Sequence, residues 1–94
     1  MLYLNVFYHT KEGKREAFLN RIKELEIDKK VREEKGCIRY DYYFSDADDN
    51  ELLLVELWES KEDQQIHIEQ PHMTLLREFK DDFVESTELK AFEA

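Results

Sequence analysis

Two of the three histidines are the side chains best suited to acid–base chemistry. His67 and His72 lie close together in the segment Ile66–Met73, with Pro71 between them. An ordinary imidazole titrates near pH 6.5, so either ring could accept a proton at neutral pH. His72 has two interpretations that the sequence leaves open. It is either a hydrogen-bonded histidine at the rim of an apolar helix stripe, or a polar group aimed into a largely apolar pocket.

A metal site is the second chemistry that these histidines suggest. Glu69 or Glu56 would have to complete a set with His67 and His72. Two ligands on one helix face are normally three or four positions apart, whereas these histidines are five apart with a proline inside. We therefore expect no metal and no other cofactor.

Polar side chains also interrupt two apolar strands. Asn5 is either tied to neighbouring backbone or points into a cavity, where its amide could bind a ligand or a developing oxyanion. Glu56 would be costly to bury unpaired, so we expect an ion pair with Arg39 where two copies of the chain meet. Trp58, on the same face as Glu56, is more often core than a ligand platform.

Tyrosines are dense, and most are expected to pack in the core, although a pocket for a flat aromatic ligand would use the same side chains. They are Tyr3, Tyr8, Tyr40, Tyr42 and Tyr43. The two isolated glycines form no phosphate-binding loop. The single cysteine, Cys37, follows a glycine at a strand start, where burial would make it inert.

Composition limits the class of protein further. The 94 residues make one domain, residues 1–94, with 41% hydrophobic residues for a core. A net charge of −9 opposes binding to nucleic acid and to anionic membranes. No apolar run approaches the roughly 18 residues of a membrane span, and the first residues do not resemble a leader, so we expect a cytoplasmic protein.

The elements that must position these residues alternate in an order of β-α-β-β-α-β. Expected strands cover residues 2–9, 37–44, 51–59 and 87–92, the last with a weak pattern. Thr10 is expected to cap a helix that reaches residue 31 or 32, Ser60 a helix to about residue 70, and Pro71 begins another. This is the α+β ferredoxin-like plan, with a four-stranded antiparallel sheet and helices on one face.

Within the expected strand 37–44, Ile38 and Tyr40 should share one face and Cys37 and Arg39 the other.

Two other expected strands are apolar on both faces. Strands 2–9 and 51–59 carry apolar residues on each face, yet the helices can cover only one. We therefore expect a homodimer packed sheet against sheet.

Three segments together resemble the antibiotic biosynthesis monooxygenase family, in particular its small quinol-oxidising and autoinducer-degrading members. They are Glu34–Tyr40, Val55–Ser60 and His67–Met73. The resemblance implies a dimeric α+β barrel with a pocket between sheet and helices. It also implies a cofactor-independent monooxygenase that uses dioxygen to oxidise a small quinol or phenol.

The same resemblance implies roles for individual residues. His72 or His67 would accept the phenolic proton, and Asn5 would hold the oxyanion. Trp58, Tyr40 and Phe79 would bind the substrate. The haem-degrading branch is a poorer match, because the positions of its helix Trp and its iron-ligating His hold His67 and Arg77 here.

Two other functions fit the same resemblance. One is an isomerase or degrading enzyme for a small signalling carbonyl. The other is a non-catalytic ligand-binding dimer, since a fold does not determine a function.

Overall fold

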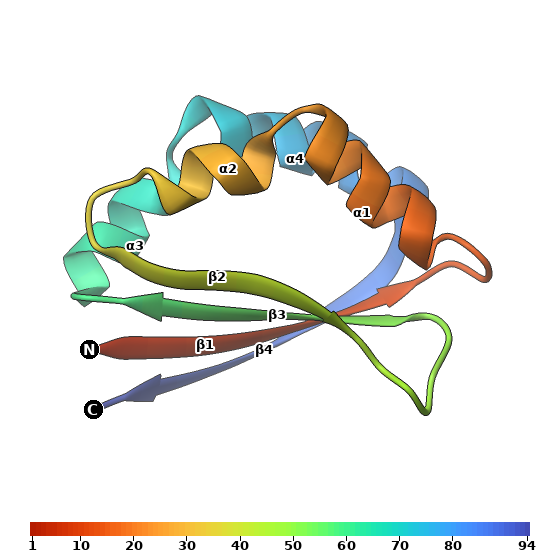
Figure 1. Ribbon diagram of the computed structural model, residues 1–94, viewed down its shortest axis with the longest axis horizontal. Helices are drawn as coiled ribbons and strands as arrows, with labels where there is room; N and C mark the ends of the chain where they lie inside the picture. Colours follow the sequence, from red (N-terminus) through yellow and green to blue (C-terminus); the bar gives the residue numbers. More distant parts are fainter.

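A four-stranded antiparallel sheet carries all the helices on one of its faces in the computed structural model, which describes residues 1–94 (Figure 1). The strand order is β2-β3-β1-β4, and the predicted α+β class and ferredoxin-like plan are confirmed. The strands are β1 (Leu2–Thr10), β2 (Cys37–Phe44), β3 (Glu51–Trp58) and β4 (Val84–Glu93). The helices are α1 (Arg15–Glu24), α2 (Ile27–Arg32), α3 (Lys61–Ile68) and α4 (Pro71–Phe83).

The two central strands, β1 and β3, each have one face buried under the helices and one that is more exposed. Leu4 on β1 pairs with Glu56 on β3, and Leu2 pairs with Trp58. All four side chains are buried on the face that the helices cover. The period of two along each strand therefore brings Glu56 and Trp58 under the helices.

A bulge in β2 overturns the predicted assignment of faces at its start. The register shifts between Cys37 and Arg39, so Cys37 lies opposite Trp58 and packs against the core with Tyr40. Ile38 is left 47% exposed. Burial, helped by Glu34, raises the pKa of the Cys37 thiol to about 11, so the thiol stays protonated at neutral pH.

The first predicted helix is in fact two, and Thr10 does not cap it. Thr10 ends β1, and its hydroxyl donates to the carbonyl oxygen of Asn50 at 2.9 Å. The chain turns through Gly13 before α1 begins at Arg15. Glu26 then takes a left-handed φ of 55°, which separates α1 from α2.

The second helical region follows its local signals. The backbone N–H of Asp63 donates to Ser60 Oγ at 3.1 Å, and Pro71 occupies the first turn of α4. Strand β4 is longer than predicted. Only Val84 is buried on this edge strand, so the sequence gives little apolar alternation from which its start could be predicted. None of the helices combines the length and the apolar character needed to cross a bilayer.

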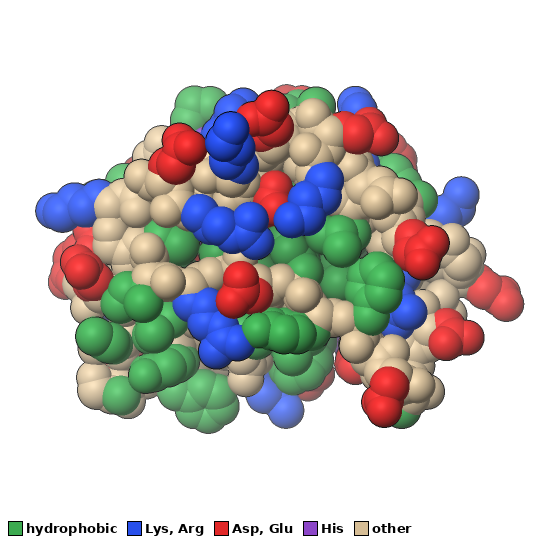
Figure 2. Space-filling view, in the orientation of Figure 1, with side chains coloured by type: hydrophobic (Ala, Val, Ile, Leu, Met, Phe, Trp, Pro, Cys, Tyr) green, Lys and Arg blue, Asp and Glu red, His purple; other side chains and the backbone are tan.

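The core lies between the helices and the covered face of the sheet. Phe18 and Ile22 of α1 and Ile27 and Val31 of α2 are fully buried there. The opposite face has no helix over it (Figure 1). Figure 2 shows hydrophobic side chains gathered around the strands, whereas many charged side chains lie on the surface of the helical layer.

Candidate active site

Two histidines from different helices contact the same carboxylate oxygen of a glutamate in a loop. His67 lies in the last turn of α3, His72 in the first turn of α4, and Glu34 in the loop between α2 and β2. Oε2 of Glu34 lies 2.8 Å from Nδ1 of His67 and 2.8 Å from Nε2 of His72. An ionised carboxylate only accepts hydrogen bonds, so each facing imidazole nitrogen carries a proton and donates it.

This arrangement determines which nitrogen of His67 can act as a base. The side chain is only 3% exposed, and burial lowers the pKa of His67, although Glu34 opposes that effect. The ring is therefore neutral at pH 7, with its proton on Nδ1. Its Nε2 atom keeps a free lone pair and is the base that the geometry presents.

Glu56 faces that lone pair. Its Oε1 atom accepts a hydrogen bond from Nε1 of Trp58 at 2.9 Å and lies 3.9 Å from Nε2 of His67. The pKa of Glu56 is raised to about 7, chiefly by burial; the hydrogen bond from Trp58 opposes this rise, and the nearby Glu34 carboxylate adds to it. A carboxyl group with this pKa gains and loses a proton readily at neutral pH.

The predicted ion pair between Glu56 and Arg39 is wrong. Arg39 lies on the open face of the sheet, where its Nε donates to Oδ2 of Asp41 at 3.0 Å. Glu56 lies on the covered face and meets only Trp58 and His67 with its carboxylate. The bulge in β2 does not alter this separation, because residues 39 and 56 remain on opposite faces of the sheet.

Two aromatic side chains hold the His67 ring in place. The Trp58 ring lies 4.6 Å from it at an interplanar angle of 34°, and the Tyr40 ring meets it edge-on at 5.7 Å. Both aromatics are at most 1% exposed. Burial raises the pKa of the Tyr40 and Tyr42 hydroxyls well above their ordinary value.

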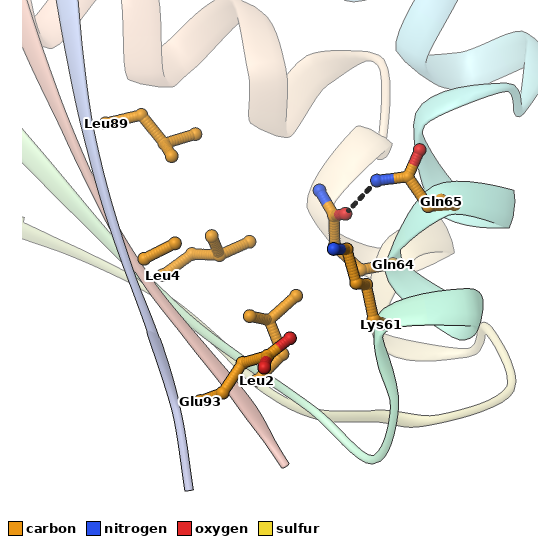
Figure 3. Close-up of a pocket in the computed structure, with 8 residues that line it drawn as sticks. Leu2, Leu4, Lys61, Gln64, Gln65, Leu89 and Glu93 are labelled. Carbon is orange, nitrogen blue, oxygen red and sulfur yellow. Dashed lines mark hydrogen bonds between the residues drawn. The ribbon is translucent and has the colours of Figure 1, made fainter.

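A pocket of about 510 Å³ lies beside this cluster, between α3 and the strands β1 and β4 (Figure 3). Its sheet side is apolar and its helix side polar. The apolar lining is Leu2, Leu4, Leu89 and Ala91, and the polar lining is Lys61, Gln64, Gln65 and Glu93. The volume suits a small organic molecule.

The pocket and the acid–base cluster share one wall. Leu2 and Leu4 line the pocket, and on the adjacent strand they pair with Trp58 and Glu56. All four side chains are buried on the same face of the sheet. Glu56 is therefore one strand away from the pocket lining.

The structure brings together four of the predicted site residues, His67, His72, Trp58 and Tyr40, and not the other two. Asn5 pairs with Val55 and belongs to the open face of the sheet, because odd-numbered residues of β1 point away from the helices. Phe79 packs against Phe18 and Phe83 in the core and lines no pocket.

Glu34 is a site residue that sequence reasoning missed. It belongs to the Glu34–Tyr40 segment that carries the family resemblance, and this is the one signal that could have found it. Gly36, with φ at +84°, turns the chain beside α3. A side chain there would collide with the carboxylate of Asp63, so this close approach requires glycine.

Glu34, His67 and His72 are also the residues that could hold a metal ion. Their ligand atoms all lie within 4.8 Å of one another. The prediction of no metal considered Glu69 and Glu56 as the third ligand and overlooked Glu34. To bind a metal, both imidazoles would have to give up the protons that they donate to Glu34.

The fold and this cluster define a class of small α+β protein with a pocket and a group of titratable side chains between sheet and helices. The family model of antibiotic biosynthesis monooxygenase matches residues 1–78. The chain belongs to the antibiotic biosynthesis monooxygenase family.

Solved structures share the fold over nearly their whole length. A candidate antibiotic biosynthesis monooxygenase from Nitrosomonas europaea is similar with a TM-score of 0.90 at 23% identity, covering 100% of this chain and 98% of that one. A conserved protein from Bacteroides thetaiotaomicron, a possible oxidoreductase, has a TM-score of 0.86 at 27% identity, covering 99% and 96%.

A third similar structure, a candidate monooxygenase of the same family from Deinococcus radiodurans, has a TM-score of 0.86 at 20% identity, covering 100% and 92%. No curated protein matches the chain.

Proposed function

We propose that the protein is a monooxygenase that oxidises a small quinol or phenol with dioxygen and uses no cofactor. For a phenol, one oxygen atom enters the ring opposite the hydroxyl and the other leaves as water. The ring becomes a quinone and gives up four electrons, which the two oxygen atoms accept. Family membership supports the monooxygenase class, and the mixed apolar and polar pocket supports a small organic substrate.

The observation that carries the proposal is the buried pair of Glu56 and neutral His67 beside this pocket. A phenolate gives an electron to dioxygen far more readily than a phenol, so the protein must first remove a proton. A substrate whose hydroxyl points past Leu4 brings that proton towards Glu56 and Nε2 of His67.

The same pair can return the proton later. The ring radical and superoxide combine to form a carbon–oxygen bond, and the resulting peroxide takes up the proton. Loss of water then breaks the O–O bond and leaves the quinone. Glu34 supports both steps, because its negative charge stabilises His67 when the ring is protonated. His72 shares that carboxylate oxygen and supports it from α4.

Oxygen consumption by the metal-stripped protein with a panel of hydroquinones tests this function. We expect uptake above background with the wild type and its loss in the His67→Ala/His72→Ala double variant. Lys29→Ala/Lys30→Ala is the control, because both side chains are exposed on α2, away from the cluster and from the open face of the sheet. Absence of uptake with every hydroquinone, or full uptake by the double variant, would contradict the proposal.

We also propose that the functional form is a homodimer through the open sheet face. Tyr3, Tyr43 and Phe92 are 41–55% exposed there or at its edge. Leu53, Val55 and Leu57 on the same face are only half-buried. An apolar face of this kind on a lone four-stranded sheet is typical of an interaction surface.

Proton transfer alone would suit the second candidate, an isomerase or degrading enzyme for a small signalling carbonyl. Glu56 and His67 could move a proton between carbon and oxygen without dioxygen. Lys61 is the one basic side chain in the pocket lining and Glu93 offsets its charge, which is weak support for a phosphorylated substrate. Turnover that continues without oxygen would favour this candidate, and ligand binding without any turnover would favour a non-catalytic dimer.

A further inference from the structure

Oxidation through a phenolate needs a hydrogen-bond donor at the substrate oxygen, because negative charge develops there. Asn5 cannot supply it within one protomer, since it lies on the open face of the sheet. In the pocket lining, α3 presents two adjacent carboxamides, Gln64 and Gln65.

The two carboxamides are joined in a way that leaves one donor free. Nε2 of Gln65 donates to Oε1 of Gln64 at 3.0 Å. That bond occupies the Gln64 oxygen, while the Gln64 nitrogen, which solvent still reaches, makes no hydrogen bond within the protein. Figure 3 shows this nitrogen on the side of the amide that faces the leucines across the pocket.

The free donor opens into the pocket. Gln64 is only 8% exposed overall and lines the pocket, so the accessible part of its side chain lies where a ligand would bind. A polar group in such a position gains from any ligand that offers an acceptor oxygen. Gln64 also precedes His67 by three residues, so both side chains project from the same side of α3.

We propose that Gln64 donates the hydrogen bond that binds the substrate oxygen and stabilises its anionic form, and that Gln65 orients it. The inference rests on the proposed function and names the group that takes the role expected of Asn5. The ligand class is a hydroxyarene of one or two rings, with the ring on Leu2, Leu4 and Leu89. Its oxygen would bind at Gln64, on the side of the pocket nearest the Glu56–His67 pair.

A pair of ligands tests this hydrogen bond without turnover. 4-Nitrophenol, at a pH where it is ionised, carries an acceptor oxygen, and 4-nitrotoluene replaces that oxygen by a methyl group of similar size. We expect the wild type to prefer 4-nitrophenol, and Gln64→Leu to reduce this preference by about 10- to 100-fold, as for a hydrogen bond to a charged group.

The control is Gln70→Leu, the same chemical change at a glutamine outside this pocket, which should keep the wild-type preference. If Gln64→Leu does not fold, Gln64→Glu keeps the shape and should still bind 4-nitrotoluene while losing 4-nitrophenol. An unchanged preference in the Gln64 variant, or a wild type that binds neither ligand or prefers neither, would overturn the inference. Oxygen uptake reports separately on the proposed function.

Discussion

Nε2 of His67 lies 3.9 Å from Oε1 of Glu56, with both side chains buried beneath the helices. This separation is longer than a hydrogen bond, so the Glu56 carboxyl group and the neutral His67 ring face each other without a direct bond. Glu34 holds the far nitrogen of His67, and Trp58 holds the near oxygen of Glu56. The two groups are therefore pre-positioned to share a proton that neither holds permanently at neutral pH.

Glu56 should make the stability of the protein depend on pH. The pKa of Glu56 rises from its ordinary value of 4.5 to about 7 on folding. At a pH between these two values, Glu56 has lost its proton in the unfolded chain and keeps it in the folded chain. Stability due to Glu56 therefore falls as the pH rises through this window, by up to about 3 kcal/mol. We expect Glu56→Gln to gain free energy of unfolding relative to the wild type between pH 5 and pH 8, measured by urea unfolding.

The wild-type curve alone would not isolate this effect. The pKa of His67 is lowered on folding, so its contribution to stability rises with pH up to about its ordinary value of 6.5. The difference between Glu56→Gln and the wild type largely removes that opposing slope. Glu59→Gln, an exposed neighbour, should follow the wild type at both pH values. A constant difference between Glu56→Gln and the wild type would show that Glu56 ionises normally.

Glu34→Gln should weaken the contacts that join α3 and α4 to the loop before β2. An amide oxygen accepts more weakly than a carboxylate, and the amide nitrogen cannot accept from an imidazole at all. Two charge-assisted bonds of 2.8 Å are affected, so we expect a loss of about 2 kcal/mol or more in free energy of unfolding.

Nitrogen NMR of the imidazoles gives a second measurement on the same variant. We expect the proton of His67 to be no longer confined to Nδ1, together with slower substrate oxidation. Glu33→Gln makes the same change at an exposed adjacent position and should alter neither stability nor tautomer. If the two variants behaved alike, Glu34 would have no positioning role.

Gly36→Ala should be far more damaging than Gly13→Ala. Both glycines have positive φ, +84° and +74°, so each substitution carries a similar backbone cost of about 1 kcal/mol. At Gly36 the new methyl group would also meet Asp63 in the first turn of α3, whereas at Gly13 it would meet open space. Thermal unfolding should show a clearly lower melting temperature for Gly36→Ala, and equal values would refute the close approach.

Val55→Lys should disrupt the proposed dimer. Val55 lies on the open face near the centre of the sheet, and a lysine there would bring a charge into a sheet-to-sheet interface. Light scattering coupled to gel filtration should give the dimer mass for the wild type and the monomer mass for this variant. Ile66→Lys places the same charge at an exposed position on α3 and should remain dimeric. A monomeric wild type would refute the proposed dimer.

Much of the fold was predictable because its signals are local. Ser60 and Pro71 begin α3 and α4 through contacts within one helical turn. The alternation along β3 assigned Glu56 and Trp58 to one face, because successive side chains of a strand point to opposite sides. The failures at Thr10, Glu26 and Cys37 arise where a turn, a left-handed residue or a bulge interrupts a regular period.

The sequence by itself determined the candidates for chemistry: two histidines, a tryptophan and a glutamate in an apolar strand. Only the tertiary structure decided how they combine. Glu34 and His67 are 33 residues apart, and their contact depends on how α3 packs beside the loop before β2. Whether a strand residue such as Asn5 faces the helices depends on sheet register, which the pairing of distant strands decides.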